Sequence, residues 1–415
     1  MHLFFYTIFL FLYRTGIGIA AIWKPKAKKW IEGRKDLIPH IKSKMAGNTK
    51  PVVWMHASSL GEFEQGRPVL ESLRELFPDI VIVLTFFSPS GYEVRKNYDK
   101  ADHVFYLPLD TKKNAKAFLD AINPTLVLWI KYDYWYHFLT ELRNRKIAAL
   151  LVSGQFRPQQ PFFKWYGRMH RYMLECFLHL FVQTPGSIEL LKSIGFRDNL
   201  SLAGDTRFDR VIDIANHFEP IPSIEEFCAG QPVLVAGSTW LEDEEEICHY
   251  ANQYPELRFI VAPHDISEDR LKEAESLFKN CIRFSKYHKG SNANVLLIDN
   301  MGMLSRIYRY GKLAYIGGGF SSDGVHNVLE AAVYSIPVVF GPEYEKYIEA
   351  VELEECGGAF SIESAIEVEE IFNDLLQNEI FRKESGEKAG QYVGSKAGAT
   401  KTILEYIQLN RLLTT

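Results

Sequence analysis

The sequence predicts an α/β protein built from two doubly wound parallel sheets. Short, strongly apolar segments of strand length alternate with amphipathic or polar segments of helical length, once in residues 51–184 and again in residues 232–342. Such alternation is typical of parallel sheets that are covered by helices on both faces. The length of 415 residues also fits two domains better than one.

Each half contains five segments whose length and apolar content are typical of buried strands. In the first half they read PVVWMHA, IVIVLTFF, TLVLWI, AALLVSG and LFVQT, at residues 51–57, 80–87, 125–130, 148–154 and 180–184. In the second half they read PVLVAGST, RFIVAPH, NVLLID, KLAYIGGG and IPVVFGP, at residues 232–239, 258–264, 294–299, 312–319 and 336–342.

The predicted domains are residues 25–215 and 231–398. Pro220, Pro222 and Gly230 mark a polar linker between them, near residues 210–231. The last segment, residues 399–415, has a helical period and is expected to pack back on the first domain. Two such halves that face each other form a cleft, and ligands of open parallel sheets bind beyond the carboxyl ends of the strands.

Residues 1–24 predict a membrane anchor. Residues 2–23 are largely apolar around a single charge, Arg14, and are long enough to cross a bilayer. Lysines 24, 26, 28 and 29 follow the run instead of preceding it as in a signal peptide, so we expect an uncleaved anchor whose basic side is cytoplasmic. Whether the anchor crosses the membrane or lies in its interface stays open, and a buried first helix is the remaining alternative. Because the basic stretch adjoins an apolar one, it favours a membrane over a nucleic acid as partner.

The sequence lacks the motifs of several classes of enzyme and binding protein. The chain contains no Walker loop, no GxSxG and no HExxH. Its five cysteines are irregularly spaced without a CxxC pair, which argues for free thiols over a disulfide framework or a zinc knuckle. The acidic run Glu242–Glu246 has no DxD triplet or ligand-spaced histidine beside it, so we expect a solvated helix face and no metal site.

Two segments of the first half carry candidate catalytic acids. In HASSLGE (residues 56–62), Ser59 and Glu62 have the spacing of a capping box, so helix capping is one interpretation of Glu62. The other interpretation is a general base, since a carboxylate at the carboxyl end of a strand faces the expected cleft. KYDYWYHF (residues 131–138) follows the third strand, and its mixture of aromatic and acidic side chains is typical both of sugar sites and of helix starts. Asp133 in this segment is the second candidate base.

Candidate ligand-binding residues follow the strands of the second half. Ser238 and Thr239 end a strand and start a helix, and such a turn offers amides, hydroxyls and a positive helix end to a phosphate. His264 follows the next strand, where a structural role is the alternative to ligand binding. Arg270, in the same segment, either meets a phosphate or pairs with Asp265 or Glu268.

The most informative segment is YIGGGFSSDGVHNVLEAA, residues 315–332. Three glycines end a strand, a polar loop follows, and a helix is predicted to begin near Asn327. His326, Asn327 and Glu330 lie within one helical turn, at the end expected to face the cleft. A carboxylate there can accept hydrogen bonds from both hydroxyls of a ribose. The spacing is not GxGxxG, so it predicts no dinucleotide fingerprint.

The order of these segments resembles the 3-deoxy-D-manno-oct-2-ulosonic acid (Kdo) transferases. The resemblance runs from the N-terminal anchor to about residue 360, and the HASSxGE and HNxLE blocks are its specific parts. It implies a GT-B fold, which consists of two Rossmann-like domains with an interdomain cleft, and a role in lipopolysaccharide synthesis. The other matching segments include TFFSPSGYE, INPTLVLWIKYDYW, AGSTWLEDEE, APHDISEDR, DNMGML and VVFGPEYEKY.

The resemblance also implies substrates and residue roles. CMP-Kdo would be the donor, bound by the second domain, and lipid A precursor (lipid IVA) the acceptor, presented at the cytoplasmic face of the inner membrane. Transfer would invert the anomeric centre without a metal or other cofactor. Glu62 matches the family's proton acceptor. To Ser238 and Thr239 of the phosphate-binding turn, the resemblance adds donor contacts at Pro263, His264, Met301, Gly302, Met303, Asn327, Val328, Leu329 and Glu330.

Two alternatives stay open. Another GT-B enzyme, such as a UDP-sugar transferase or an epimerase, shares the fold and the ribose-binding acid. A non-catalytic membrane scaffold with a degenerate site is the second, although the intact Glu62 and the HNVLE block argue against it.

Overall fold

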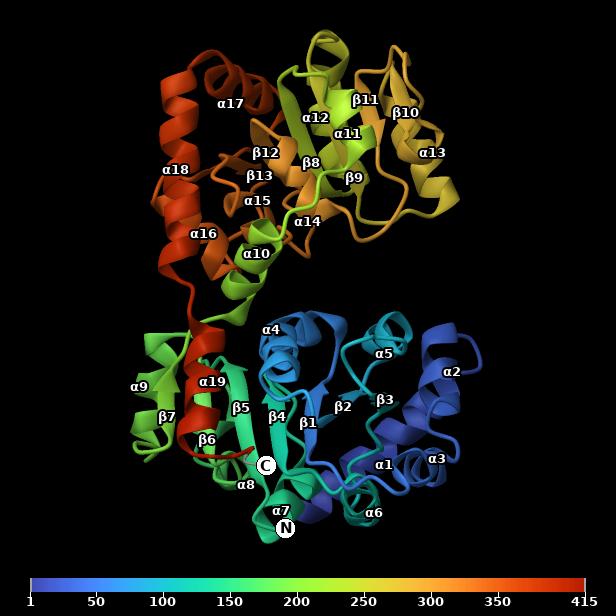
Figure 1. The fold of residues 1–415 in the computed structure, drawn as a ribbon, viewed down its shortest axis with the longest axis vertical. Helices are drawn as coiled ribbons and strands as arrows, with labels where there is room; N and C mark the ends of the chain where they lie inside the picture. Colours follow the sequence, from blue (N-terminus) through green and yellow to red (C-terminus); the bar gives the residue numbers. More distant parts are fainter. Residues whose placement is uncertain (1, 414–415) are drawn as a thin grey trace. The chain divides into compact units, whose positions relative to one another are not determined.

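The described part of the chain, residues 2–413, contains two parallel seven-stranded sheets in this computed structural model (Figure 1). The strand orders are β3-β2-β1-β4-β5-β6-β7 and β10-β11-β9-β8-β12-β13-β14. Unit 1 holds the residues up to Asp209 and those from Gly398 onward, and unit 2 holds Arg210–Ala397. The predicted architecture of two doubly wound parallel sheets is therefore confirmed.

Unit 1 contains the first sheet and the helices around it. Its strands are β1 (Val52–Ala57), β2 (Val81–Phe86), β3 (His103–Tyr106), β4 (Leu126–Ile130), β5 (Ala148–Gly154), β6 (His179–Val182) and β7 (Leu200–Leu202). Its helices are α1 (His2–Ala20), α2 (Pro25–Glu32), α3 (Leu37–Met45), α4 (Leu60–Leu76), α5 (Pro89–Arg95), α6 (Lys112–Ile122), α7 (Tyr136–Asn144), η1 (Pro161–Phe163), α8 (Arg168–Leu174), α9 (Pro185–Ser193) and α19 (Ala399–Leu409).

Unit 2 contains the second sheet. Its strands are β8 (Val233–Thr239), β9 (Arg258–Pro263), β10 (Cys281–Arg283), β11 (Val295–Leu297), β12 (Leu313–Ile316), β13 (Val338–Phe340) and β14 (Ala359–Ser361). Its helices are α11 (Pro222–Cys228), α12 (Leu241–Gln253), α13 (Glu268–Leu277), η2 (Phe284–Lys286), α14 (Leu304–Ile307), η3 (Tyr308–Tyr310), α15 (Leu329–Ala332), α16 (Ile348–Glu355), α17 (Ala365–Gln377) and α18 (Glu379–Ser395).

The central strands are apolar at every position because helices cover both faces of each sheet. Every side chain of β1 is buried. Trp54 packs on one face with Phe118 and Phe138 of α6 and α7, whereas Val53 and Met55 belong to the core on the other face, beneath α4 and α19. This two-sided burial explains why β1 and β4 read as continuous apolar runs.

Each sheet reverses its strand order at one point. In unit 1 the chain runs outward from β1 through β2 to β3, and then returns to β4 on the other side of β1. In unit 2 the corresponding reversal lies between β8 and β12. The carboxyl ends of the strands at such a reversal border a crevice that commonly holds the ligand in doubly wound folds.

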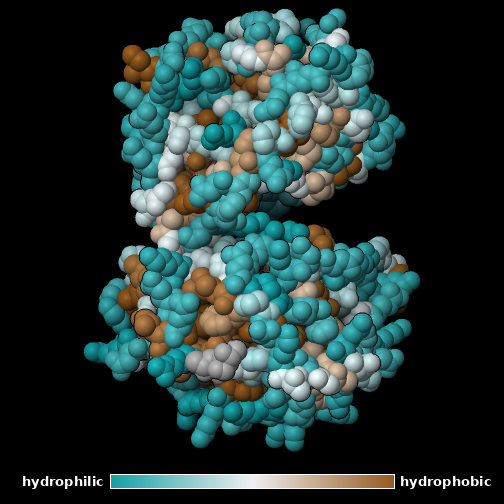
Figure 2. All heavy atoms as spheres, in the orientation of Figure 1, coloured by the Kyte–Doolittle hydropathy of each residue, from teal (hydrophilic) through white to brown (hydrophobic). Residues whose placement is uncertain are grey.

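Helix α1 lies against unit 1 along a single stripe of side chains. Leu10 is buried, Tyr6, Tyr13, Ile17 and Ala20 are half-buried, and the other side chains of the helix from Leu3 onward are exposed. The ring of Tyr13 contacts Trp30 and Phe87 at about 6 Å between centroids. By length and composition α1 is able to cross a membrane. The face of the molecule drawn in Figure 2 is mostly hydrophilic, which contrasts with the exposed apolar side chains of α1, among them Leu3, Phe4, Phe5, Ile8, Phe9, Phe11, Leu12 and Ile19.

The polar stretch near residues 210–231 is largely helical. Helix α10 (Thr206–Asn216) crosses the boundary between the units, and α11 follows it. The chain leaves unit 2 again at Ala397, and the last helix, α19, belongs to unit 1, where it contacts α4. The chain passes between the units after Asp209 and again after Ala397. A hydrogen-bonded contact links these two points, because the Asp209 carboxylate accepts from the backbone amides of Gly398 and Thr400 at 2.6 Å each.

Replacing Asp209 by alanine is expected to loosen α19 without unfolding the protein. The carboxylate caps the first turn of α19, and losing such a cap costs about 1–2 kcal/mol. Amide hydrogen exchange in α19 should accelerate by about 5- to 30-fold. Asp213→Ala, which removes an exposed acid from the same helix α10, is the matched control and should leave this exchange unchanged. Equal exchange in α19 for the two variants would contradict the capping role.

Candidate active site

Unit 1 brings its two candidate acids together at the reversal between β1 and β4. Glu62 lies in the first turn of α4, directly after β1, and Asp133 lies in the loop between β4 and α7. Ser58 joins them, because its backbone amide donates to the Glu62 carboxylate and its hydroxyl donates to the Asp133 carboxylate. Two carboxylates from segments that follow neighbouring strands therefore bond to one serine.

The capping interpretation of Glu62 holds only in part. The Ser59 hydroxyl accepts a hydrogen bond from the Glu62 amide at 3.4 Å, as an N-cap residue does. In a capping box the glutamate carboxylate would return to the amide of Ser59, whereas here it bonds to the amide of Ser58. The carboxylate of Glu62 thus bonds to the same residue, Ser58, that bonds to Asp133.

The surroundings of the two acids favour their protonated forms. Burial, and then the negative charge of Asp133, raise the pKa of Glu62 from 4.5 to about 7. Burial also raises the pKa of Asp133, against the opposing effect of the Ser58 hydroxyl. A carboxylate that titrates near neutral pH is well matched to taking up a proton during catalysis.

A buried polar chain lies beneath Ser58. Trp54 Nε1 donates to the hydroxyl of Thr85 at 2.8 Å, and Thr85 lies 3.0 Å from Nδ1 of His56. Nε2 of His56 in turn lies 3.5 Å from the Ser58 hydroxyl. Burial lowers the pKa of His56 to about 3, so the ring is neutral at physiological pH. We infer that His56 and Ser58 position the acid pair, a role that the sequence pattern did not reveal.

Unit 2 gathers its candidate donor residues at the carboxyl edge of one set of neighbouring strands. Strands β11, β9, β8 and β12 are adjacent in that order, and all run parallel. Their carboxyl ends lead into the segments that contain Met301–Met303, Pro263–His264, Ser238–Thr239 and Asn327–Glu330, respectively. The topology therefore places every sequence-predicted donor residue at a single edge of the sheet.

Three rings stack at this edge. The rings of His264 and His326 lie 4.5 Å apart and nearly parallel, at 9°. The ring of Trp240 stacks on His264 at 4.7 Å, and its Nε1 donates to Nε2 of His326 at 3.1 Å. Burial, and then the neighbouring His264, lower the pKa of His326 to about 4. His326 is thus neutral at physiological pH, with its proton on Nδ1.

Asp243 holds the glycine-rich loop in place. One carboxylate oxygen accepts from the amides of Trp240 and Gly318 at 2.8 Å each, and the other accepts from the Tyr315 hydroxyl at 2.8 Å. Gly317 has no room for a side chain, because a Cβ there would collide with the carbonyl oxygen of Ser238. The turns after β8 and β12 are therefore packed together and fixed by one buried acid.

The structure corrects three expectations in this region. The acidic run after Trp240 is not a wholly solvated face, since Asp243 and Glu244 are buried. Arg270 pairs with Glu244 at 2.5 Å and with Glu273 at 3.5 Å, and not with Asp265 or Glu268. Helix α15 begins at Leu329, and Asn327 lies before it.

The residues predicted to bind the donor differ in whether their side chains are accessible to a ligand. The Thr239 side chain is fully buried and its hydroxyl donates to Glu244 at 2.7 Å, so it is not directed at a ligand. Val328 and Leu329 are also fully buried, which leaves only their backbone groups for contact. Glu330 accepts a hydrogen bond from Asn327 Nδ2 at 3.1 Å. The other predicted donor residues are Ser238, partly exposed; Pro263, buried; His264, exposed; Met301 and Gly302, exposed; and Met303, partly exposed.

Several known proteins are similar to this chain in sequence or in fold. A family model described as 3-deoxy-D-manno-octulosonic-acid transferase (kdotransferase) matches residues 33–210. The 3-deoxy-D-manno-octulosonic acid transferase of Chlamydia trachomatis serovar A is 28% identical over 376 residues, which cover 86% of this chain and 85% of the relative. That of Aquifex aeolicus is 26% identical over 338 residues, which cover 79% of this chain and 87% of the relative.

Among solved structures, UDP-GlcNAc 2-epimerase from Neisseria meningitidis superposes with a TM-score of 0.62 over 86% of this chain and 99% of that one. At 16% identity this likeness concerns the fold alone. It agrees with the expected GT-B architecture of two Rossmann-like domains. The chain therefore has the expected GT-B fold, and its sequence is similar to the Kdo transferases, whose family model matches residues 33–210.

Proposed function

We propose that this protein transfers Kdo from CMP-Kdo to lipid A precursor, with inversion, during lipopolysaccharide synthesis. The observation that carries the proposal is the acid pair of unit 1, in which Ser58 bonds to both Glu62 and Asp133 and burial raises the pKa of Glu62 to about 7. The relationship to Kdo transferases supports the choice of donor and sugar.

In the proposed reaction, Glu62 takes the proton from an acceptor hydroxyl. The hydroxyl oxygen forms a bond to the anomeric carbon of Kdo, and the bond from that carbon to the phosphate oxygen breaks. The electron pair leaves with CMP, so negative charge grows on the phosphate. The positive end of α12, which begins at Leu241 after Ser238, is suited to stabilise this charge. Glu330 is assigned to the ribose hydroxyls, and the reaction as proposed uses neither a metal nor another cofactor.

Calorimetry with CMP and UDP tests the donor assignment against the alternative of a UDP-sugar enzyme. We expect CMP to bind measurably, and UDP at least about tenfold more weakly. Tighter binding of UDP would contradict the proposal and favour a UDP-sugar transferase or an epimerase.

We further propose that α1 attaches the protein to the cytoplasmic face of the inner membrane. The stripe of Tyr6, Leu10 and Tyr13 faces unit 1, which leaves a broad apolar surface on a helix whose following residues are basic and exposed. Because α1 lies along the side of unit 1, an interfacial position suits it better than a perpendicular span.

Placing charges on the exposed face of α1 is expected to release the protein from vesicles that contain anionic lipid. Phe11→Asp with Leu12→Asp should lower the membrane partition coefficient by about 100-fold or more, since each side chain loses about 1.5–3 kcal/mol of apolar burial. Co-sedimentation with the vesicles measures the effect. Ile366→Asp with Ile380→Asp, which changes two exposed apolar residues of unit 2, is the matched control. Equal binding by the two double variants would overturn the anchor proposal.

A further inference from the structure

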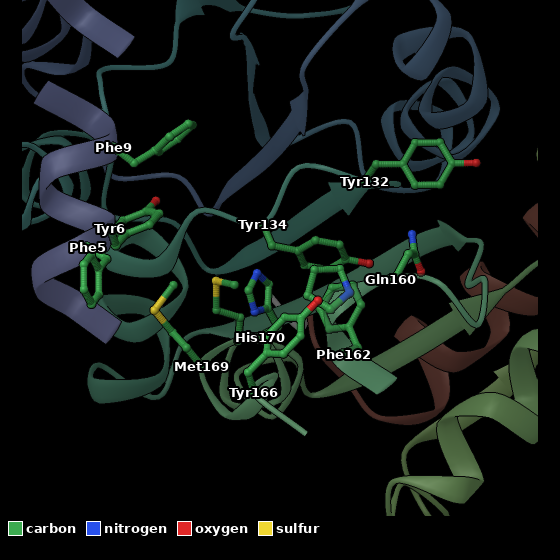
Figure 3. Close-up of a pocket in the computed structure, with 12 residues that line it drawn as sticks. Phe5, Tyr6, Phe9, Tyr132, Tyr134, Gln160, Phe162, Tyr166, Met169 and His170 are labelled. Carbon is green, nitrogen blue, oxygen red and sulfur yellow. The ribbon is translucent and has the colours of Figure 1, made fainter. Parts of the chain in front are cut away.

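A cavity of about 550 Å³ lies in unit 1 between α1 and the loop that follows β4 (Figure 3). Phe5, Tyr6 and Phe9 of α1 form one wall, and Tyr132 and Tyr134 of the loop contribute to the opposite side. Side chains from η1 and α8 complete the lining. The cavity is of the size that binds small molecules or parts of larger ones, about 300–1,000 Å³.

Both exposed and buried side chains line the cavity. Phe5 and Phe9 on α1 and Tyr166 before α8 are 59%, 54% and 46% exposed, whereas Phe162 and Met173 are 4% and 2% exposed. A chain-like apolar ligand can therefore enter beside α1 and bury its far end among core residues. Phe5 and Phe9, which border the cavity, belong to the same apolar surface of α1 that we assign to the membrane.

The same cavity adjoins the acid pair. Tyr132 and Tyr134, which line it, are the immediate neighbours of Asp133 in the chain. Asp133 bonds to Ser58, which bonds to Glu62. The hydroxyl of Tyr132 donates to Gln155 at 2.5 Å, which ties this loop to the segment after β5. The acids themselves do not line the cavity, but Tyr132 and Tyr134 in its lining lie on either side of Asp133 in the chain.

The walls of the cavity are held by contacts of their own. The hydroxyl of Tyr6 donates to Asp110, which also accepts from the amides of His137 and Phe138 at 2.9 and 3.0 Å. Tyr134 meets the ring of Phe162 edge-on at 5.0 Å. A preformed apolar site costs little ordering when a ligand binds.

We propose that this cavity receives an acyl chain of the lipid acceptor and thereby holds the acceptor's sugar beside Asp133 and Glu62. The inference rests on the proposed function and names how that acceptor is recognised. An amphiphile fits the site because its apolar part matches the rings from α1 and its polar head reaches the acid pair. Each methylene that the cavity buries should strengthen binding by about fourfold.

The test compares lipid A precursor with the same acceptor after chemical removal of its acyl chains, both in mixed detergent micelles. The measured quantity is the ratio of kcat/KM for the two acceptors, so a general loss of activity in a variant cancels. We expect the wild type to favour the acylated acceptor. Met169→Trp, which fills the cavity, should reduce the ratio by at least about tenfold, because it excludes several methylenes. Leu178→Trp, a similar enlargement at an exposed site of unit 1 outside the cavity lining, should keep the wild-type ratio.

A second measurement needs no variant. Lipid A precursor with a photoreactive diazirine near the end of one acyl chain is bound to the wild-type protein and illuminated, and the labelled peptides are identified by mass spectrometry. Label in residues 160–173 is expected. Label confined to the exposed face of α1, at Phe4 and Leu12, together with an unchanged ratio in Met169→Trp, would overturn this inference alone. Absence of Kdo transfer by the wild type to either acceptor would overturn the proposed function, and this inference with it.

Discussion

Replacing Glu62 by glutamine is expected to lower turnover by at least about 100-fold while CMP binding stays near normal. A general base contributes about 10²–10⁴-fold to the rate, whereas a helix cap contributes only about 1 kcal/mol of stability. Glutamine keeps the shape of the side chain and can accept the hydrogen bond from the Ser58 amide, but it cannot take up the proton. Steady-state kinetics with CMP-Kdo and lipid A precursor measures the loss.

Glu64→Gln is the matched control for this experiment. Glu64 lies two residues farther along α4 and forms partly exposed ion pairs with Arg67 and Arg95, at 3.4 and 2.7 Å. Removing such pairs changes stability by about 1 kcal/mol or less, and the variant should stay active. Near wild-type turnover in Glu62→Gln would mean that Glu62 is only a cap, and Asp133 would then be the next candidate base.

The raised pKa of Glu62 also predicts a pH dependence. The carboxylate form acts as the base, so kcat/KM should rise with pH through an apparent pKa near 7. In Asp133→Asn the apparent pKa of the pH–rate profile should be lower, because the negative charge of Asp133 raises the pKa of Glu62. An unchanged apparent pKa would show that the two acids are not coupled.

The same raised pKa predicts that stability falls as pH rises, whereas kcat/KM increases. The folded pKa lies above the unfolded value, so the folded state binds more protons between pH 4.5 and about 7, and the free energy of unfolding falls as pH rises through that window. Above pH 7 the wild type carries a partly buried carboxylate that Glu62→Gln lacks. The variant should therefore have a higher Tm than the wild type at pH 8, as expected for a residue kept for catalysis at a cost in stability.

Replacing Glu330 by glutamine is expected to weaken CMP binding by about 1–3 kcal/mol, or about 5- to 150-fold. The carboxylate is assigned to the ribose hydroxyls, and a neutral amide accepts such bonds less strongly than a charged group. The side chain is partly exposed, and glutamine can still accept the bond from Asn327, so the Tm without ligand should barely change. Calorimetry with CMP measures the affinity.

Glu343→Gln provides the control for Glu330. It removes an exposed acid from the segment after β13 and should leave CMP affinity unchanged. An unchanged CMP affinity in Glu330→Gln would show that Glu330 does not contact the ribose, and another residue would have to take that role.

The interior of both sheets could be predicted from the sequence, but their edges could not. The five predicted strands of each half correspond to the central strands, whose burial on both faces produces continuous apolar runs. The four strands without a prediction, β3, β7, β10 and β14, are the edge strands of the two sheets. Each has only three or four residues and is partly exposed, so no apolar run or alternation distinguishes it from a loop.

Within the candidate site, the sequence showed which residues follow a strand, but it did not show which residues bond to one another. Glu62 and Asp133 each follow a central strand, and this placed both near the same crevice from the sequence alone. Ser58, which joins them, read only as a turn residue. Asp243 read as one of several solvated acids, because its partners Tyr315 and Gly318 lie more than 70 residues away in the chain. Partnerships of this kind depend on the tertiary fold and leave no local signal.

Mass spectrometry of the acceptor after incubation with CMP-Kdo tests the central claim most directly. Lipid A precursor should gain the mass of at least one Kdo residue with the wild-type protein, and CMP should be released in equal amount. Glu62→Gln should yield at most about one hundredth of this product in the same time. A wild-type protein that binds CMP but leaves the acceptor mass unchanged would contradict the account and support a non-catalytic role.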